Sequence, residues 1–144
     1  MKTPGSHDER SWAQSFAGTP HRLTNQRRVI LRQLAGARKY LTAQELHARL
    51  APLKPRIGLA TVYRTLETLR HLGLVATVAQ AHGETAYLYC GSGHHHHAVC
   101  TRCGRVDDVP CHSLPKFERM LSNALRFQLT EHQLEFYGVC ARCS

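Results

Sequence analysis

The stretch GLATVYRTLETLRHLG, residues 58–73, decides the fold of the first half of the chain. Its apolar residues recur at spacings of four, three and three, which places them on one stripe of an α-helix. These residues are Val62, Leu66, Leu69 and Leu72. Gly73 suits the residue after a helix, because glycine adopts a positive φ without steric cost. Outside the stripe the helix presents Thr61, Tyr63, Arg64, Thr65 and Arg70.

Shorter helical patterns come before this stretch. Residues 24–36, TNQRRVILRQLAG, predict an amphipathic helix that is capped by Thr24 and ends near Gly36. Residues 42–51, TAQELHARLA, open with a capping box, because Glu45 follows Thr42 by three residues. A weaker pattern predicts a further short helix over about residues 8–17.

A hairpin pattern follows the helices. Residues 74–80 and 85–90 predict two strands around a turn at His82-Gly83. Three short helices followed by a hairpin are typical of a winged helix-turn-helix, with residues 58–73 in the recognition position. After Cys90 the pattern predicts a small α+β unit, with strands over 94–100, 105–109 and 134–139 and a helix over 114–125.

The chain has 144 residues and a formal net charge of +9, and this charge is unevenly placed. Residues 1–83 hold 13 Lys and Arg against 4 Asp and Glu, whereas residues 84–144 hold 6 of each. A basic first half favours nucleic acid as a partner, with a solvated basic surface as the plain alternative. No apolar run reaches the roughly 18 residues of a membrane helix, and MKTPGSHDER lacks the apolar core of a signal peptide. We therefore expect a cytoplasmic protein with no membrane partner.

All six cysteines lie in the second half: Cys90, Cys100, Cys103, Cys111, Cys140 and Cys143. In a reducing compartment, grouped cysteines indicate metal ligands or redox groups rather than disulfides. Four of them form two Cys-x-x-Cys pairs. Two such turns complete a tetrahedral four-cysteine site with no open position, so we expect a structural Zn²⁺ on Cys100, Cys103, Cys140 and Cys143. The alternative is a redox pair, which normally stands alone beside a βαβ pattern.

Four consecutive histidines come just before the first Cys-x-x-Cys pair. Alternate residues of a strand face opposite sides, so His95 and His97 share one face and His94 and His96 share the other. One strand can thus serve two metal sites. A site that combines the Cys90 thiolate with two imidazoles favours Zn²⁺ over Mn²⁺ or Mg²⁺. The alternative is an exposed polar strand beside a buried Cys90.

Several side chains suit contacts with DNA. Arg64 can pair with a guanine edge, while Thr61, Thr65 and Tyr63 suit phosphate or a thymine methyl. Arg22, Arg27 and Arg28, at the start of an earlier helix, are candidate phosphate contacts. An ordinary surface helix is the alternative.

Taken in order, LTNQRRVIL, LTAQELHARL, GLATVYRTLETLRHLGLV, HHHHAVCTRCGRV and YGVCARC resemble the ferric uptake regulator (Fur) superfamily over about residues 22–143. The resemblance implies a homodimeric, metal-dependent DNA-binding repressor. We expect an α+β chain with a winged helix-turn-helix DNA-binding domain over 1–83, of which 1–11 form a mobile tail. A hinge over 84–92 then leads to a small α+β dimerisation domain over 93–144, which holds the four-cysteine zinc site.

Within the superfamily the chain is most similar to the zinc uptake regulators (Zur). LTAQELHA, IGLATVYR and Cys90 followed by four histidines carry this similarity, and Tyr40 stands where iron-sensing members usually have His. The resemblance implies a regulatory zinc on Cys90, His95 and His97. The fourth ligand of these relatives is an Asp, and its position here is Ala76. His82 is the candidate replacement, with Glu84 or water as alternatives.

The resemblance also implies a third metal site, on His94, His96 and His132. The Glu of that site falls on Pro115, and Cys111, His112 or Glu118 are candidates to replace it. The chain would then hold two zinc ions, or three with this site filled.

These expectations describe a zinc-responsive repressor that binds a palindromic operator as a dimer and controls zinc uptake and homeostasis genes. The alternative within the superfamily is a regulator that responds to manganese, iron, nickel or peroxide. An enzyme or a zinc-storage protein is the rival class, because Cys90, His95, His97 and a water would satisfy a catalytic zinc. The sequence indicates no general base and no small-molecule substrate, and an enzyme would leave the basic first half unexplained.

Overall fold

The computed structural model describes residues 9–91, 95–109, 114–130, 132 and 134–144. The chain divides into two compact units, Met1–Gly93 and His94–Ser144. Within the described ranges, none of the helices is both long enough and apolar enough to cross a membrane.

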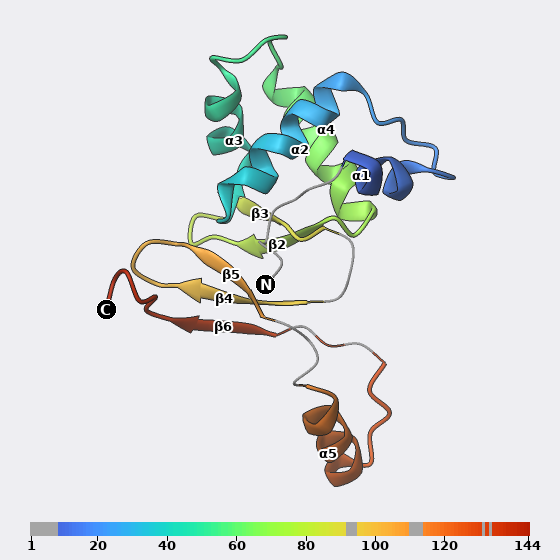
Figure 1. The fold of residues 1–144 in the computed structure, drawn as a ribbon, viewed down its shortest axis with the longest axis vertical. Helices are drawn as coiled ribbons and strands as arrows, with labels where there is room; N and C mark the ends of the chain where they lie inside the picture. Colours follow the sequence, from blue (N-terminus) through green and yellow to red (C-terminus); the bar gives the residue numbers. More distant parts are fainter. Residues whose placement is uncertain (1–8, 92–94, 110–113, 131, 133) are drawn as a thin grey trace. The chain divides into compact units, whose positions relative to one another are not determined.

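The first unit combines helices with a small antiparallel sheet. The described helices are α1 (Glu9–Phe16), α2 (Asn25–Ala37), α3 (Ala43–Leu50) and α4 (Leu59–His71). The strands are β1 (Leu41–Thr42), β2 (Val75–Ala79) and β3 (Thr85–Tyr89), in the order β1-β3-β2. Figure 1 shows α2, α3 and α4 gathered on one side of this sheet. This is a winged helix-turn-helix, with β2 and β3 as the wing, and it confirms the predicted class.

The predicted caps are present. The Thr24 hydroxyl accepts a hydrogen bond from the Arg27 backbone N–H at 3.3 Å. Thr42 and Glu45 form the capping box: the Thr42 hydroxyl accepts from the Glu45 N–H at 3.2 Å, and the Glu45 carboxylate accepts from the Thr42 N–H at 2.8 Å. Each cap satisfies backbone donors that the first turn of a helix leaves unpaired.

Three details of the first unit differ from the sequence expectation. Residues 9–11, expected within a mobile tail, belong to α1, and the rest of that tail lies outside the described residues. Helix α2 continues past Gly36 and ends where Arg38 takes a left-handed φ of 47°. Strand β1 was not predicted, because its two residues are too few to show alternation; it pairs with β3.

The apolar stripe of α4 faces a core that draws on every described helix of the unit and on the sheet. Val62, Leu66 and Leu69 are fully buried there. Helix α1 adds Trp12, which is 1% exposed and whose indole N–H donates to the Tyr89 hydroxyl at 2.8 Å. The Trp12 and Tyr89 rings meet edge to face, with centroids 6.3 Å apart. These contacts hold α1 against the end of β3, the second strand of the wing.

The second unit has a three-stranded sheet and one described helix. Strand β4 (His96–Cys100) lies between β5 (Val106–Val109) and β6 (Glu135–Gly138), antiparallel to β5 and parallel to β6. Helix α5 (Pro115–Leu125) has Pro in its first turn, as predicted, and none of its residues is buried. Figure 1 shows α5 standing apart from the sheet of this unit. The α+β class is confirmed, but this unit has little core among the residues described.

Candidate metal centre and nucleic-acid interface

Four cysteines of the second unit converge. The sulfur atoms of Cys100, Cys103, Cys140 and Cys143 all lie within 4.8 Å of one another. The Sγ atoms of Cys103 and Cys140 are 3.8 Å apart. A tetrahedral zinc ion with bonds of about 2.3 Å requires sulfur separations of about 3.8 Å. The four side chains therefore fit the structural zinc that the sequence predicts, and their number leaves no open coordination position.

The parallel pairing of β4 and β6 places the two Cys-x-x-Cys turns side by side. Cys100 is paired with Gly138 in the sheet, so Cys140 follows the neighbouring strand end by two residues. Each pair is closed by a backbone turn, with the Gly104 N–H on the Cys100 carbonyl and the Cys143 N–H on the Cys140 carbonyl, both at 2.8 Å. The site therefore joins the end of the chain to the first strand of the unit.

The thiol groups strongly affect one another. The Cys140 backbone N–H donates to the Cys100 sulfur at 3.3 Å, and this hydrogen bond with its neighbours lowers the pKa of Cys100 to about 6. The thiols of Cys103 and Cys140 raise the pKa of Cys143 to about 12. Without a cation, the four thiols cannot all ionise easily at the same time. A divalent cation would favour ionisation of all four, because coordinating thiols bind as thiolates. With Zn²⁺ the site carries a charge of about −2.

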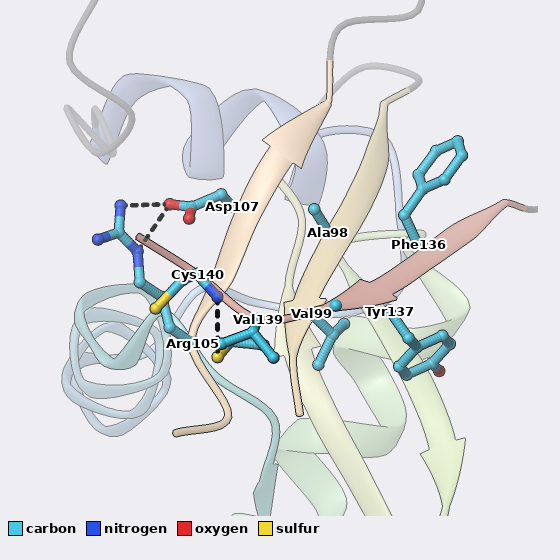
Figure 2. Close-up of a pocket in the computed structure, with 10 residues that line it drawn as sticks. Ala98, Val99, Arg105, Asp107, Phe136, Tyr137, Val139 and Cys140 are labelled. Carbon is cyan, nitrogen blue, oxygen red and sulfur yellow. Dashed lines mark hydrogen bonds and ion pairs between the residues drawn. The ribbon is translucent and has the colours of Figure 1, made fainter. Parts of the chain in front are cut away.

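An apolar hollow of about 220 Å³ lies beside the four cysteines (Figure 2). Its lining includes Ala98 and Val99 of β4 and the exposed Phe136 and Tyr137 of β6. At its edge the Arg105 guanidinium pairs with the Asp107 carboxylate, at 2.6 and 2.9 Å. All the residues that line the hollow belong to this unit.

The histidine strand has the predicted alternation. His95 and His97 lie together, with ring centroids 5.0 Å apart and ligand nitrogens within 4.8 Å. Burial lowers the pKa of His97, and the neighbouring His95 lowers it further. A lowered pKa keeps the imidazole neutral, which is the form that binds a metal. These two histidines of the second unit are therefore placed so that they could supply two ligands to one metal ion.

Two carboxylates beside these histidines were missed in the sequence. Asp108 is paired with His97 across β4 and β5, and its Oδ1 lies 3.8 Å from the Nε2 of His95. Glu135 is paired with His97 from the other side, on β6, and accepts a hydrogen bond from the Tyr137 hydroxyl at 2.5 Å. The sequence could have indicated the position of Asp108. In a hairpin that turns between Cys100 and Arg105, residue 97 lies opposite residue 108.

The first unit corrects the choice of His82. Cys90 follows the end of β3, where its N–H donates to the Leu74 carbonyl, whereas His82 lies in the turn at the opposite tip of the hairpin. Five strand residues at about 3.4 Å each separate Thr85 from Cys90, or about 17 Å. His82 and Glu84 therefore cannot share an ion with Cys90. Ala76, paired with Leu88, offers no donor atom.

On the other face of β4, three residues of the predicted third site or its alternatives come together. The Nε2 atoms of His96 and His132 are 3.1 Å apart, and the Nδ1 of His132 lies 2.5 Å from the Glu118 carboxylate. Glu118 stands one turn after Pro115 on α5, so its carboxylate is available to the expected third site in place of the Glu that Pro115 replaces. His94, Cys111 and His112 lie outside the described residues.

Helix α4 presents part of the expected DNA-contacting set. Tyr63 and Arg64 are exposed, and the Arg64 guanidinium donates to the half-buried Thr61 hydroxyl at 3.4 Å. Thr65 is only 1% exposed and faces the core, so the expectation that it contacts DNA is corrected. Arg70 pairs with Glu67 at 2.6 Å and lowers the pKa of that carboxyl.

Two of the candidate phosphate contacts around the start of α2, Arg22 and Arg27, differ in their surroundings. Arg22 has an exposed side chain that is accessible to a phosphate. Arg27 is half-buried, and its guanidinium donates to the Arg22 carbonyl at 2.6 Å and to the Thr68 hydroxyl at 3.3 Å. Arg27 is thus engaged inside the unit.

A basic winged helix followed by a unit with clustered thiol and imidazole ligands defines a metal-responsive DNA-binding regulator. Residues 19–137 match the model of the ferric uptake regulator family. The chain belongs to the ferric uptake regulator family, as the resemblance predicted. Members of this family are transcription regulators, and this settles the question of an enzyme: the chain is not one.

Individual relatives carry different names. The chain is 32% identical over 122 residues to the peroxide-responsive repressor PerR of Staphylococcus aureus (strain USA300), covering 85% of this chain and 82% of that protein. The solved ferric uptake regulator of Vibrio cholerae is 31% identical, with a TM-score of 0.63 over 91% of this chain and 99% of its own. A zinc-bound manganese uptake regulator is 27% identical, with a TM-score of 0.63 over 92% and 97%.

Proposed function

We propose that the chain is a cytoplasmic, zinc-responsive transcriptional repressor that binds palindromic operator DNA as a dimer and controls zinc uptake and homeostasis genes. The observation that carries the choice of metal is Cys90, a thiol placed directly after the wing. A thiolate with two imidazoles selects zinc over the harder manganese and magnesium ions.

The regulatory ion would be held by Cys90 of the first unit and by His95 and His97 of the second. Four residues separate Cys90 from His95, and an extended chain spans at most about 3.6 Å per residue, so the linker permits a shared ion. Asp108 is the best-placed fourth ligand, because its carboxylate already approaches His95 at 3.8 Å. The predicted hinge over 84–92 is corrected, because Thr85–Tyr89 form strand β3 of the first unit and the boundary between the units falls at Gly93/His94. Zinc, when bound, would add a cross-link to the covalent connection between the two units.

Such a cross-link explains metal dependence without any change inside the units. Two DNA-binding units must be held at one angle to enter successive major grooves of a palindrome. If the units sample many relative angles without zinc, the apparent affinity for the operator falls with the fraction of molecules that is competent to bind. The coupling is reciprocal, so operator DNA should tighten zinc binding.

The dimer would form through the second unit. Regulators of this family bind DNA as dimers. On α5, Phe117, Met120 and Leu125 are 45%, 58% and 64% exposed, and Phe136 and Tyr137 expose their rings on β6. A second copy of this chain would cover these apolar side chains and the hollow beside Cys140. Sedimentation of Met120→Glu should show a monomer, with Lys116→Glu on the same helix as the charged control.

The carboxylates support a second candidate. Asp108 beside His95 adds an oxygen ligand of the kind that manganese and iron prefer. One 32% identical relative is named a peroxide-responsive repressor. A regulator that responds to manganese, iron, nickel or peroxide is therefore the alternative within the family.

A metal titration of operator binding separates the two. A duplex selected by the zinc-loaded protein from a random pool would be titrated in Zn²⁺, Mn²⁺, Ni²⁺ and, without oxygen, Fe²⁺, with metal content measured per chain. We expect tight binding at the lowest free concentration with Zn²⁺, and loss of this response in Cys90→Ser but not in Cys111→Ser. A Cys90→Ser protein with full zinc dependence would exclude the proposed regulatory site, and a stronger response to another metal would establish the alternative.

A further inference from the structure

Arg27 of α2 contacts groups from two other helices of the first unit and from the loop that precedes α2. One guanidinium nitrogen donates to the Arg22 carbonyl at 2.6 Å, and another donates to the Thr68 hydroxyl of α4 at 3.3 Å. The guanidinium also lies 5.8 Å from the ring centroid of Phe16, which is buried on α1. A single planar cation thus touches α1, the entrance to α2, and α4.

Thr68 links Arg27 to the exposed turn of α4 through two hydrogen bonds. Its hydroxyl accepts from Arg27 and donates to the Arg64 backbone carbonyl at 2.9 Å. Arg64 is the residue of α4 best suited to a guanine edge, because its side chain is exposed and its guanidinium makes only a long hydrogen bond, 3.4 Å, to the Thr61 hydroxyl among the contacts described. The chain of hydrogen bonds therefore runs from α2, through a buried threonine, to the turn of α4 that carries the expected base contact.

We propose that Arg27 is a positioning residue for the recognition helix, which fixes the turn of α4 around Arg64 through Thr68 rather than binding a DNA phosphate. This inference rests on the proposed binding of operator DNA by α4. This positioning role requires the planar guanidinium group of arginine, which carries several N–H donors. A guanidinium can donate in several directions within one plane, whereas a lysine ammonium on a flexible stem does not hold the same set of partners.

The two roles predict opposite results for Arg27→Lys. A phosphate contact depends on charge, so lysine would preserve it and base preference would stay as it was. A positioning role depends on the fork, so lysine should weaken operator binding by about tenfold or more. It should also reduce the discrimination between the operator and single-base variants at the position read by Arg64. Arg49→Lys is the matched control, because Arg49 is exposed on α3 and lies outside the contacts of Arg27, Thr68 and Arg64.

The partner residue supplies an independent test. Thr68→Val keeps the shape of the side chain but removes the hydroxyl that links Arg27 to the Arg64 carbonyl. We expect the same loss of base discrimination in Thr68→Val, and a double variant whose loss is smaller than the product of the two single losses. Circular dichroism and zinc content would verify that each variant remains folded.

The experiment uses the full-length, zinc-loaded protein and a duplex that the wild type selects from a random pool. If the wild type selects no duplex, the proposed function itself fails. If it does, and Arg27→Lys or Thr68→Val binds and discriminates like the wild type, the positioning role is overturned. A salt slope that falls by about one in Arg27→Gln, with base preference intact, would assign Arg27 to a phosphate instead.

Discussion

The first unit encloses one continuous apolar core, whereas the second buries only two apolar side chains among its described residues, Cys100 and Val106. One of those two is itself a ligand of the expected zinc. The second unit instead brings together four thiols, at least three histidine rings and several carboxylates. Its described helix buries nothing.

This contrast teaches how a short chain divides its sources of stability. A unit of about fifty residues is too small to gain much from apolar burial, and metal ligation or association commonly supplies the difference. The first unit can hold its shape without ligands and present fixed side chains to DNA. We expect the second to depend on the proposed metal ions and on a partner copy, and therefore to respond to both. The following experiments test whether the two units differ in this way.

Removal of the structural zinc should have the largest effect. In Cys103→Ser we expect the second unit to lose its amide protection against hydrogen exchange while α2, α3 and α4 keep theirs. Zinc binding contributes on the order of 10 kcal/mol to folding in comparable four-ligand sites. Cys111→Ser, which leaves the four ligands intact, is the control. Protected amides throughout a zinc-free second unit would show that it has a sufficient core of its own.

A cavity in the first core should cost less, and should act on that unit alone. Leu66 is 0% exposed, so Leu66→Ala should lower the free energy of unfolding by about 2–5 kcal/mol. Urea denaturation measures this change, and bound zinc per chain should stay constant. Leu72→Ala, at a half-buried position near the end of α4, should cost clearly less. Equal costs at the two positions would contradict the core assignment.

Loss of the expected base contact should affect binding and leave both units folded. Arg64→Ala should weaken operator binding by about 1–3 kcal/mol and relax the preference at one base position. Anisotropy titrations with single-base variants of the operator measure both quantities. Unchanged affinity and preference would mean that another helix reads the DNA.

The smallest effect is expected at a helix cap. Thr42→Ala removes the hydroxyl that accepts from the Glu45 N–H and should cost about 1 kcal/mol of stability in the first unit. Gln44→Ala, exposed in the same turn of α3, should change the free energy of unfolding in urea by no more than about 0.5 kcal/mol. A neutral Thr42→Ala would show that the capping box adds nothing to this unit.

Local rules predicted much of the first unit. The caps at Thr24 and Thr42 and the stripe of α4 depend on neighbours within a few residues, and these are visible in the sequence. Helix α2 ends at Ala37, one residue beyond the predicted Gly36, because Arg38 takes the left-handed conformation. Strand β1 depends on pairing with a segment more than forty residues away, which a two-residue pattern cannot indicate.

Two features of the sequence predicted the candidate metal ligands: the types of side chain and the alternation of residues along a strand. The two Cys-x-x-Cys pairs define their own site, and alternation separates His95 and His97 from His96. The choice of His82 failed because proximity in a hairpin depends on register, and a turn residue is far from the strand end. Asp108 was missed for the same reason: only the pairing of β4 with β5 brings it to His95.

The hydrogen bond between Trp12 and Tyr89 gives this protein a built-in optical probe. Trp12 is the single tryptophan of the chain, and its indole N–H is bound to the residue directly before Cys90. The emission of one buried indole therefore reports on the environment next to the proposed regulatory ligand. Zinc occupancy could then be followed on the unmodified chain at submicromolar protein concentration, with Tyr89→Phe as the variant that disconnects the fluorophore from the site.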